Sequence, residues 1–221
     1  MPASSNAVSD HIAALRREYA DHGLTADDLG PDPVAAFRRW LDAAGAAGLY
    51  EPNAMVVSTV GADAAPSSRM VLLKGVDDRG FAFYTNRDSR KGRELAANPR
   101  CAVLVPWHPI ERQVRIDGVA EPVTDDEADA YFSSRPRGSQ LGAWASPQSQ
   151  PVDGRAELEA RYQEHRERFA DNETVPRPPQ WSGYRIRPDR IEFWQGRPGR
   201  MHDRIVFERS GDDWQVGRLA P

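Results

Sequence analysis

The sequence predicts a mostly β protein, a largely antiparallel barrel with helices packed on its outside. Five strand-like runs follow one another in quick succession: AMVVSTV, RMVLLKGV, FAFYT, CAVLVPW and RQVRIDGVAEPV. The links between them are short, and short links join antiparallel neighbours because parallel strands need long crossovers. More strands return near the C-terminus, and so many strands favour a barrel or a sandwich.

The composition is that of an ordinary water-soluble domain. Of the 221 residues, 39% are hydrophobic and 28% are charged, enough to build a proper core. The formal net charge of −4 argues against a general nucleic-acid binder, although a local basic pocket stays possible. The single cysteine, Cys101 in the run CAVLV, excludes an intrachain disulfide, and we expect a buried thiol. Without a secretory signal or a membrane-spanning run, the expected location is the cytoplasm.

Two helices are expected before the first strand, after a disordered start over residues 1–10. The segment HIAALRREYADHGL places three apolar side chains at helical spacing, Ile12, Leu15 and Tyr19, and the helical pattern breaks at Gly23. Asp32-Pro33 is a good helix start, because the aspartate caps and proline suits the first turn. The helix that follows has one apolar face, formed by Val34, Phe37, Leu41 and Ala44.

Turns and helices separate the strands that follow. Asp77-Asp78-Arg79-Gly80 is a hairpin turn between the second and third strands. The short helix SRKGRELAAN lies between the third and fourth strands and ends at Asn98-Pro99. Thr124-x-x-Glu127 is a capping box, which predicts a helix from about Asp125 to Ser133.

The C-terminal part combines one charged helix with further strands. GRAELEARYQEHRERFADN is the predicted helix, and the proline-rich VPRPPQ after it is a loop. WSGYRIRP, IEFWQG, RIVFER and WQVGRL are the predicted strands, and the last two are joined by a turn at Ser210-Gly211-Asp212-Asp213.

Basic residues gather around the second and third strands. RMVLLKGVDDRGFAFYTNRDSRK contains four candidate anion ligands, Arg69, Lys74, Arg90 and Lys91. A phosphate suits guanidinium and ammonium groups, and a helix starting near Ser89 would add free backbone N–H groups. The alternative is that these are ordinary solvated cations on surface strands.

A second candidate phosphate site follows the capping box. Tyr131 and Arg135 are four residues apart and share one helix face, and Ser139 follows in the turn-prone RPRGSQ. A phenol, a guanidinium and a hydroxyl together make a good phosphate cradle. The alternative is a solvated helix end, where arginine is common.

Other residues suit contact with a flat ring. Gln113 lies in a strand and Gln148-Ser149 in a loop, and amide side chains can read both a donor and an acceptor on a heterocycle. Trp194 can cover a ring. The cluster Arg200-Met201-His202-Asp203-Arg204 offers arginines that could stabilise an anion and a histidine that could act as acid or base. Solvated glutamines, a core tryptophan and a structural histidine are the alternatives, and neither a Ser/His/Asp order nor HExxH spacing is present.

Taken together, six spaced motifs resemble the pyridoxamine (pyridoxine) 5′-phosphate oxidases. They are RMVLLK, FYTNRDSRK, PWHPIERQV, YFSSRPRGSQLGAWASPQS, IEFWQGRPGRMHDR and WQVGRLAP. The resemblance runs from about Leu15 to Pro221. It implies an FMN-binding split β-barrel and a homodimer with two FMN sites at the subunit interface, each built from both chains. It further implies a flexible N-terminal segment with a lid helix over residues 1–30, and a split-barrel domain over residues 31–221.

The resemblance also implies a role for each candidate residue. Arg69, Arg90 and Lys91 would hold the FMN phosphate. The rest of the cofactor would be met by Met70, Lys74, Tyr84, Thr85, Gln113, Gln148, Ser149, Trp194 and Arg204. The substrate phosphate would be held by Lys74, Tyr131, Arg135 and Ser139. Arg200 and His202 would be the catalytic pair at the pyridine ring, and Arg16 and Tyr19 would fold over the occupied site.

The implied reaction is the oxidation of pyridoxamine or pyridoxine 5′-phosphate to pyridoxal 5′-phosphate, with O2 reduced to H2O2. Neither a metal, a nucleic acid nor a membrane is expected to take part. Two departures from the family pattern are Ser182 in WSGY, where a second glycine is common, and Pro198-Gly199 before the arginine. One tension is that strict strand alternation sends Arg69 and Lys74 to opposite faces.

Three alternatives stay open. The first is a related enzyme that oxidises another reduced ring, such as a phenazine precursor, and would lack the YxxxRxxxS pattern. The second is a carrier of FMN or of a B6 phosphate that has no activity. The third is a phosphate-binding regulatory module for nucleic acid, which the net charge of −4 disfavours.

Overall fold

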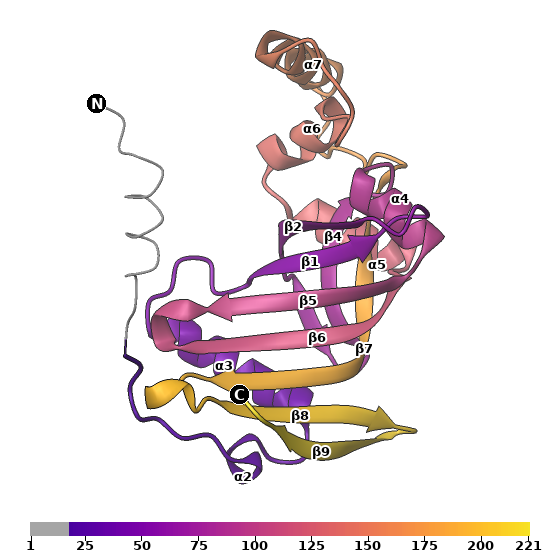
Figure 1. The fold of residues 1–221 in the computed structure, drawn as a ribbon. Coiled ribbons are helices and arrows are strands. Elements are labelled where there is room, and N and C mark those ends of the chain that lie inside the picture. Colours follow the sequence, from indigo (N-terminus) through magenta and orange to yellow (C-terminus); the bar gives the residue numbers. More distant parts are fainter. Residues whose placement is uncertain (1–17) are drawn as a thin grey trace, which may run out of the picture.

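A computed structural model describes residues 18–221, and in it an antiparallel sheet curls into a half-barrel (Figure 1). The strands of this sheet are β1 (Ala54–Val60), β2 (Pro66–Leu72), β3 (Gly75–Asp77), β4 (Gly80–Asn86), β5 (Arg100–Trp107), β6 (Arg112–Pro122), β7 (Trp181–Gln195), β8 (Asp203–Ser210) and β9 (Asp213–Leu219). The helices are α2 (Ala26–Leu29), α3 (Pro33–Ala46), α4 (Arg90–Ala97), α5 (Asp125–Ser134), α6 (Arg137–Ala145) and α7 (Arg155–Arg168). Short 3-10 turns are η1 (His108–Ile110) and η2 (Pro198–Arg200).

The long strand β7 organises the sheet. The strand order is β2-β1-β5-β6-β7-β4-β3, and β8 and β9 extend the sheet from β7. The first half of β7 pairs with β4 and the second half with β8, while β6 runs along nearly its whole length. The sheet therefore forks at β7: β4 and β3 continue it beside the first half of this strand, and β8 and β9 continue it beside the second half.

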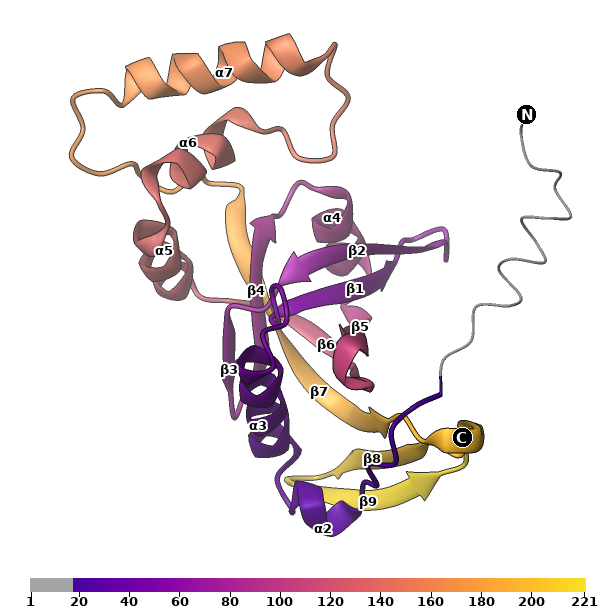
Figure 2. The ribbon, with the colours of Figure 1, turned by 90° about the vertical axis from the view of Figure 1, so that its left-hand side faces the viewer.

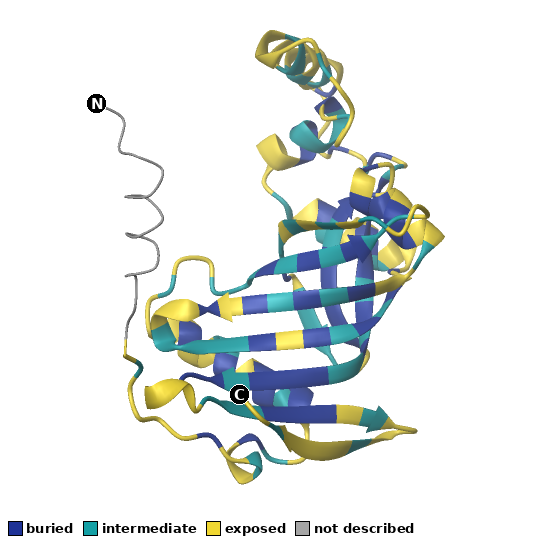
Figure 3. Cartoon of the chain, in the orientation of Figure 1, coloured by how far each residue is buried: buried dark blue, intermediate teal, exposed yellow. Residues whose placement is uncertain are grey.

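The core lies inside the half-barrel and is closed by α3. Buried and part-buried residues alternate along β1 and β5, which is the pattern of strands with one face in the core (Figure 3). From α3, Phe37 packs edge-on against Phe81 at 4.9 Å and Trp40 against Phe193 at 5.1 Å. The predicted capping by Asp32 is confirmed, because its carboxylate accepts the Val34 N–H at 2.8 Å.

Three helices stand at the end of the molecule opposite β8 and β9, as Figure 2 shows for α5, α6 and α7. A small second core joins them to the start of β7, and it consists of Phe132, Leu141, Phe169, Val175 and Trp181. The predicted capping box at Thr124 and Glu127 is present. The predicted burial of Cys101 is confirmed, and burial raises the pKa of this thiol to about 12.

The structure corrects two strand predictions. RMVLLKGV, predicted as one strand, is divided between β2 and β3, because the Leu73 N–H bonds to Asn53 while the next N–H, of Lys74, bonds to Ala82. The chain thus changes partners here, so simple alternation does not relate Arg69 to Lys74. Conversely, WSGYRIRP and IEFWQG form the single strand β7, which crosses a bulge opposite Gly118.

Two helix predictions also change. The turn-prone RPRGSQ begins the helix α6, which starts after Pro136. The helix predicted over HIAALRREYADHGL is wrong for residues 18–24, and its earlier part lies outside the described residues. The N–H groups of Ala20 and Leu24 instead bond to the carboxylates of Glu111 and Asp203, which fastens this segment to the half-barrel. The capped turn of α2 was not predicted. Within the described chain, we find no helix long and apolar enough to cross a membrane.

Candidate active site

One cavity of about 630 Å³ lies between the β2–β3 connection, β4, α5 and α6. This volume is within the range of small-molecule sites. Its wall includes nine of the predicted site residues, namely Met70, Lys74, Tyr84, Thr85, Lys91, Tyr131, Arg135, Ser139 and Gln148. The same wall contains residues that we did not predict: Val71, Leu72, Asn86, Pro136, Gly142, Ala143, Ser146 and Trp181.

Among the described residues, the cavity wall carries three cations, Lys74, Lys91 and Arg135, and no carboxylate. Lys91 is buried, and its ammonium group bonds only to neutral acceptors, Thr85 Oγ1 at 3.1 Å and Gln148 Oε1 at 3.3 Å. Burial first, and then the positive charge of Arg69, lower the pKa of Lys91. A buried cation that bonds directly to no carboxylate is costly, so this wall is suited to an anionic ligand.

Arg135 is a second cation of this wall, with a buried donor that the described residues leave unsatisfied. Its Nη1 atom is buried and has no hydrogen-bond partner in the part of the chain that the structure describes. The guanidinium lies 4.9 Å from the Trp181 ring and 5.6 Å from the Phe132 ring, and burial lowers its pKa. Beside it, Tyr131 stacks on Tyr84 at 4.1 Å. The cavity thus joins an aromatic wall to unpaired donors, which suits a flat ring with a phosphate.

Arg69 and Arg90 do not line this cavity and instead share one buried carboxylate. Glu94 of α4 accepts from Arg69 Nη2 at 3.1 Å and from Arg90 Nε at 2.8 Å. Two hydroxyls complete the set, Thr59 at 2.5 Å and Ser67 at 2.6 Å. Sequence reasoning missed Glu94, although its i,i+4 spacing from Arg90 could have indicated the pair.

A second group of predicted residues lies around the far end of β7. Tyr19 and Trp194 line another cavity of about 280 Å³ together with Gln113. His202 packs on the Trp194 ring at 4.6 Å and on the Tyr19 ring at 5.4 Å. Its Nδ1 accepts the Arg197 N–H at 3.1 Å, so a neutral His202 carries its proton on Nε2. Arg200 is exposed, in a turn with φ of 62°.

Arg204 belongs to this second group and is anchored by a buried carboxylate. Glu192 accepts from its Nε at 2.8 Å and from its Nη2 at 3.2 Å, and Arg190 donates to the same carboxylate. The Ala220 carbonyl accepts from Arg204 Nη1 at 2.9 Å. Three of the five guanidinium N–H groups are therefore in use, which leaves two for a ligand.

The two groups are separate within one chain. Trp181 lines the first cavity and Trp194 the second, and the intervening length of β7 corresponds to a contour of about 40 Å. No residue in the described range lines both cavities. Of the remaining predicted residues, Ser149 follows Gln148 in a turn with φ of 68° without lining either cavity, and Arg16 lies outside the described residues.

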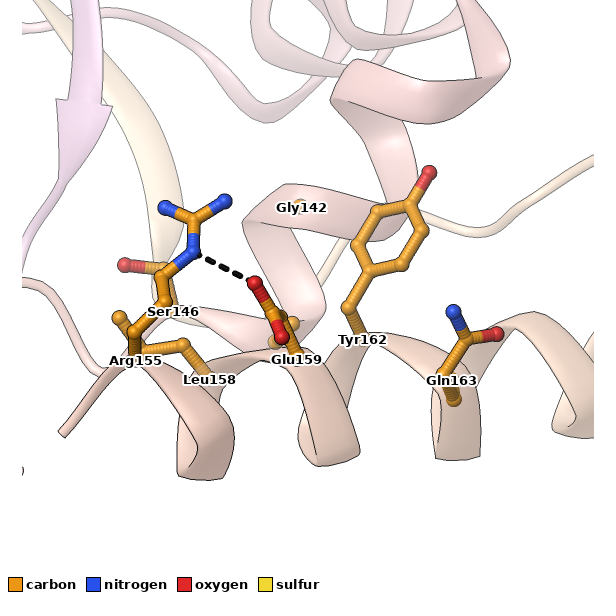
Figure 4. Close-up of a pocket in the computed structure, with 8 residues that line it drawn as sticks. Gly142, Ser146, Arg155, Leu158, Glu159, Tyr162 and Gln163 are labelled. Carbon is orange, nitrogen blue, oxygen red and sulfur yellow. Dashed lines mark hydrogen bonds and ion pairs between the residues drawn. The ribbon is translucent and has the colours of Figure 1, made fainter. Parts of the chain in front are cut away.

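A third hollow, of about 330 Å³, separates α6 from α7. Figure 4 shows its charged pair, Arg155 and Glu159, turned toward each other, with the Nε to Oε1 distance at 2.9 Å. Leu158 and Tyr162 supply apolar surface. Because its charges are already paired, this hollow lacks the unmatched cations of the first cavity. Among the described residues we find no cluster suited to hold a metal ion.

Comparison with known proteins shows the family of this chain. Residues 41–169 match the family described as pyridoxamine 5′-phosphate oxidase, and residues 181–221 match the pyridoxine 5′-phosphate oxidase C-terminal dimerisation region. This chain belongs to the pyridoxamine 5′-phosphate oxidase family. It is therefore an oxidoreductase, and both the resemblance seen in the sequence and the split-barrel prediction are confirmed.

Curated relatives in this family are similar along nearly the whole chain. A pyridoxine/pyridoxamine 5′-phosphate oxidase from a Nocardioides species is 59% identical over 95% of this chain and 98% of its own length. The protein of the same name from Cupriavidus necator is 57% identical over 95% and 99%, respectively.

Solved structures show the same fold. PhzG from Burkholderia lata 383, in complex with tetrahydrophenazine-1-carboxylic acid, has a TM-score of 0.85 and 34% identity, covering 92% of this chain and 100% of its own. A pyridoxamine 5′-phosphate oxidase-related, FMN binding protein from Nostoc punctiforme has a TM-score of 0.68 at 13% identity, covering 87% and 100%, and supports the fold alone.

Proposed function

We propose that this protein oxidises pyridoxamine 5′-phosphate or pyridoxine 5′-phosphate to pyridoxal 5′-phosphate, with FMN as cofactor and O2 reduced to H2O2. The observation that carries the proposal is the first cavity, where Lys74, Lys91 and Arg135 line a wall to which residues 18–221 contribute no carboxylate. The buried Nη1 of Arg135 has no hydrogen-bond partner among the residues that the structure describes, and an incoming phosphate oxygen would satisfy it.

Together, the cavity and the cationic cluster beside it at the start of α4 would hold two phosphorylated rings. Arg69, Arg90 and Lys91 would hold the FMN phosphate, because their charges gather around the start of α4. Tyr131, Arg135 and Ser139 would hold the substrate phosphate, with Lys74 beside them. Bound FMN would supply the hydride acceptor and pass the electrons to O2. The protein contributes orientation and charge, since each phosphate anchors one end of a ring.

The second group of residues would complete the site across a homodimer. Trp194, Arg200, His202 and Arg204 all lie in the segment that matches a dimerisation region. They are remote from the first cavity of their own chain, so they would serve the cavity of the partner subunit. There, His202 would present its Nε2 proton to the substrate ring, because the backbone N–H of Arg197 occupies Nδ1.

One experiment tests the proposal directly. The purified protein is supplied with FMN, its flavin absorbance is recorded, and pyridoxine 5′-phosphate or pyridoxamine 5′-phosphate is added in air. We expect pyridoxal 5′-phosphate and H2O2 to form together. A protein that cannot be reconstituted with FMN would defeat the proposal, and flavin binding without peroxide formation would indicate a carrier.

A second candidate function is the oxidation of a reduced phenazine precursor. The 34% identity and TM-score of 0.85 to PhzG favour testing it. The Tyr131, Arg135 and Ser139 set argues for a phosphorylated substrate instead, since a substrate with only a carboxylate would leave donors of this set unsatisfied. Comparing the turnover rate of the phosphorylated substrate with that of the phenazine precursor in the same assay separates the two functions.

A further inference from the structure

Glu94 occupies an unexpected position for a site that would bind a phosphate. Its side chain is only 9% exposed, and it lies between Arg69, 19% exposed, and Arg90, 58% exposed. The same two arginines are the ones assigned above to the FMN phosphate. A carboxylate and a phosphate are both anions, so they compete for the same guanidinium donors.

The network around Glu94 is fully connected. Arg69 Nη1 donates to Thr59 Oγ1 at 2.5 Å and Arg69 Nη2 donates to Ser67 Oγ. Each of these hydroxyls then donates its own proton to Glu94 Oε2. The four donors lower the pKa of Glu94 to about 2, so the carboxylate is ionised at neutral pH.

The local charge balance depends on this carboxylate. Arg69, Arg90 and Lys91 contribute three positive charges, and Glu94 is the anion that pairs with the two arginines. The charges of the same cluster also act on Lys91, since Arg69 lowers the pKa of Lys91 and Glu94 raises it. With Glu94 in place, an arriving phosphate meets less attraction and must share donors that are already in use.

We propose that Glu94 is a built-in counter-anion of the cofactor-phosphate site that Arg69, Arg90 and Lys91 form. Glu94 holds the two arginines in place in the free protein, and it limits how tightly the phosphate of FMN is bound. This inference rests on the function proposed above and adds a determinant of cofactor affinity to it. Its specific consequence is that Glu94 acts on the phosphate and not on the flavin ring. Riboflavin, which lacks the phosphate, should be indifferent to Glu94.

The test measures the dissociation constants of FMN and riboflavin for the wild-type apoprotein and for Glu94→Gln, by quenching of flavin fluorescence. Glutamine keeps the size and one acceptor while removing the charge. We expect FMN to bind about tenfold more tightly to Glu94→Gln, because a nearby repulsive charge is gone, and riboflavin to bind unchanged. In thermal unfolding, the apoprotein should be less stable than wild type, since Arg69 loses its anion, while the stabilisation added by FMN should grow.

A matched control is Glu127→Gln. Glu127 is also held by two arginines, Arg79 at 2.7 Å and Arg185 at 2.9 Å, and these lower its pKa to about 2. It does not line the first cavity. We expect this variant to lose stability, because within the described chain Arg79 and Arg185 then keep only their ion pairs with Asp77, and to keep both flavin affinities.

The outcomes separate the two proposals. FMN binding to Glu94→Gln that is unchanged or weaker, or an equal change for FMN and riboflavin, overturns the role of Glu94. A wild-type protein that binds neither flavin overturns the proposed function itself. If Glu94→Gln does not fold, Glu94→Asp takes its place in the test, because its side chain is one methylene shorter and moves the carboxylate away from the arginines. It should then bind FMN more tightly than wild type, and weaker binding would count against Glu94.

Discussion

Arg135 is the residue on which the proposed substrate site depends most. Its guanidinium faces the aromatic wall of the cavity, and no acceptor meets its buried Nη1 within residues 18–221. We expect Arg135→Ala to raise KM for the phosphorylated substrate by about 10- to 100-fold, the worth of a charged hydrogen bond, while the dissociation constant of FMN changes little. Steady-state kinetics and flavin titration measure the two effects separately.

Arg168→Ala is the control for this prediction. Arg168 also lies over a tryptophan ring, at 5.1 Å from Trp144, but it belongs to α7 and lines no part of the first cavity. Its removal should leave both constants as in the wild type. An equal loss of substrate and FMN affinity in Arg135→Ala would contradict the assigned role.

Individual site residues were predictable where their relation is local. The four-residue spacing of Tyr131 and Arg135 indicated a common site, and both line the cavity. The shared helix face was wrong, because α5 ends at Ser134 and Arg135 follows it with extended backbone. Glu94 was missed because its partner Arg69 lies on another element, and pairing between β2 and α4 leaves no trace in sequence spacing. Glu192 was missed for the same reason, since Arg204 reaches it from the neighbouring strand.

At the level of elements, the bulge between β6 and β7 lies where the sheet branches. Gly118 sits where the register shifts, and a Cβ at this position would lie 2.2 Å from the Arg187 carbonyl oxygen. We expect Gly118→Ala to lower the free energy of unfolding by about 2–3 kcal/mol, because the backbone must move to admit the methyl group. Urea denaturation measures this loss.

A glycine-to-alanine substitution in α3 should change the free energy of unfolding in the opposite direction. Gly45 lies in α3, and a Cβ there would meet nothing within 4 Å. Gly45→Ala should therefore raise the free energy of unfolding by about 0.5–1 kcal/mol through helix propensity alone. Similar stabilities for the two alanine variants would show that the backbone at Gly118 is not constrained.

Strand identities were predictable, whereas strand boundaries were not. Alternation and turn residues indicated β1, β4 and β5, but the division of RMVLLKGV depends on which neighbour accepts each N–H, and that is decided by pairing with Asn53 and Ala82. Likewise, Pro136 indicated the end of α5 correctly, but packing of Leu141 into the second core makes the following segment helical.

For the whole molecule, the separation of the two residue groups is the central fact. The first cavity lies near α5 and α6, while Trp194 and His202 pack at the other end of β7. The sequence could predict both groups, since each rests on local motifs. It could not show that they lie apart in one chain, because this follows from the length of β7 and its fork.

A mixing experiment tests whether the groups meet across a homodimer. Arg135→Ala damages the first cavity, and Arg200→Ala damages the second group at an exposed position. If each site combines the cavity of one chain with the β7–β8 end of its partner, a mixed dimer has one site with both defects and one intact site. Random exchange places about half of the dimers in this mixed form, so activity should recover to about a quarter of wild type at low substrate concentration. If each site lies within a single chain, the mixture stays as inactive as its components, and the shared-site proposal is wrong.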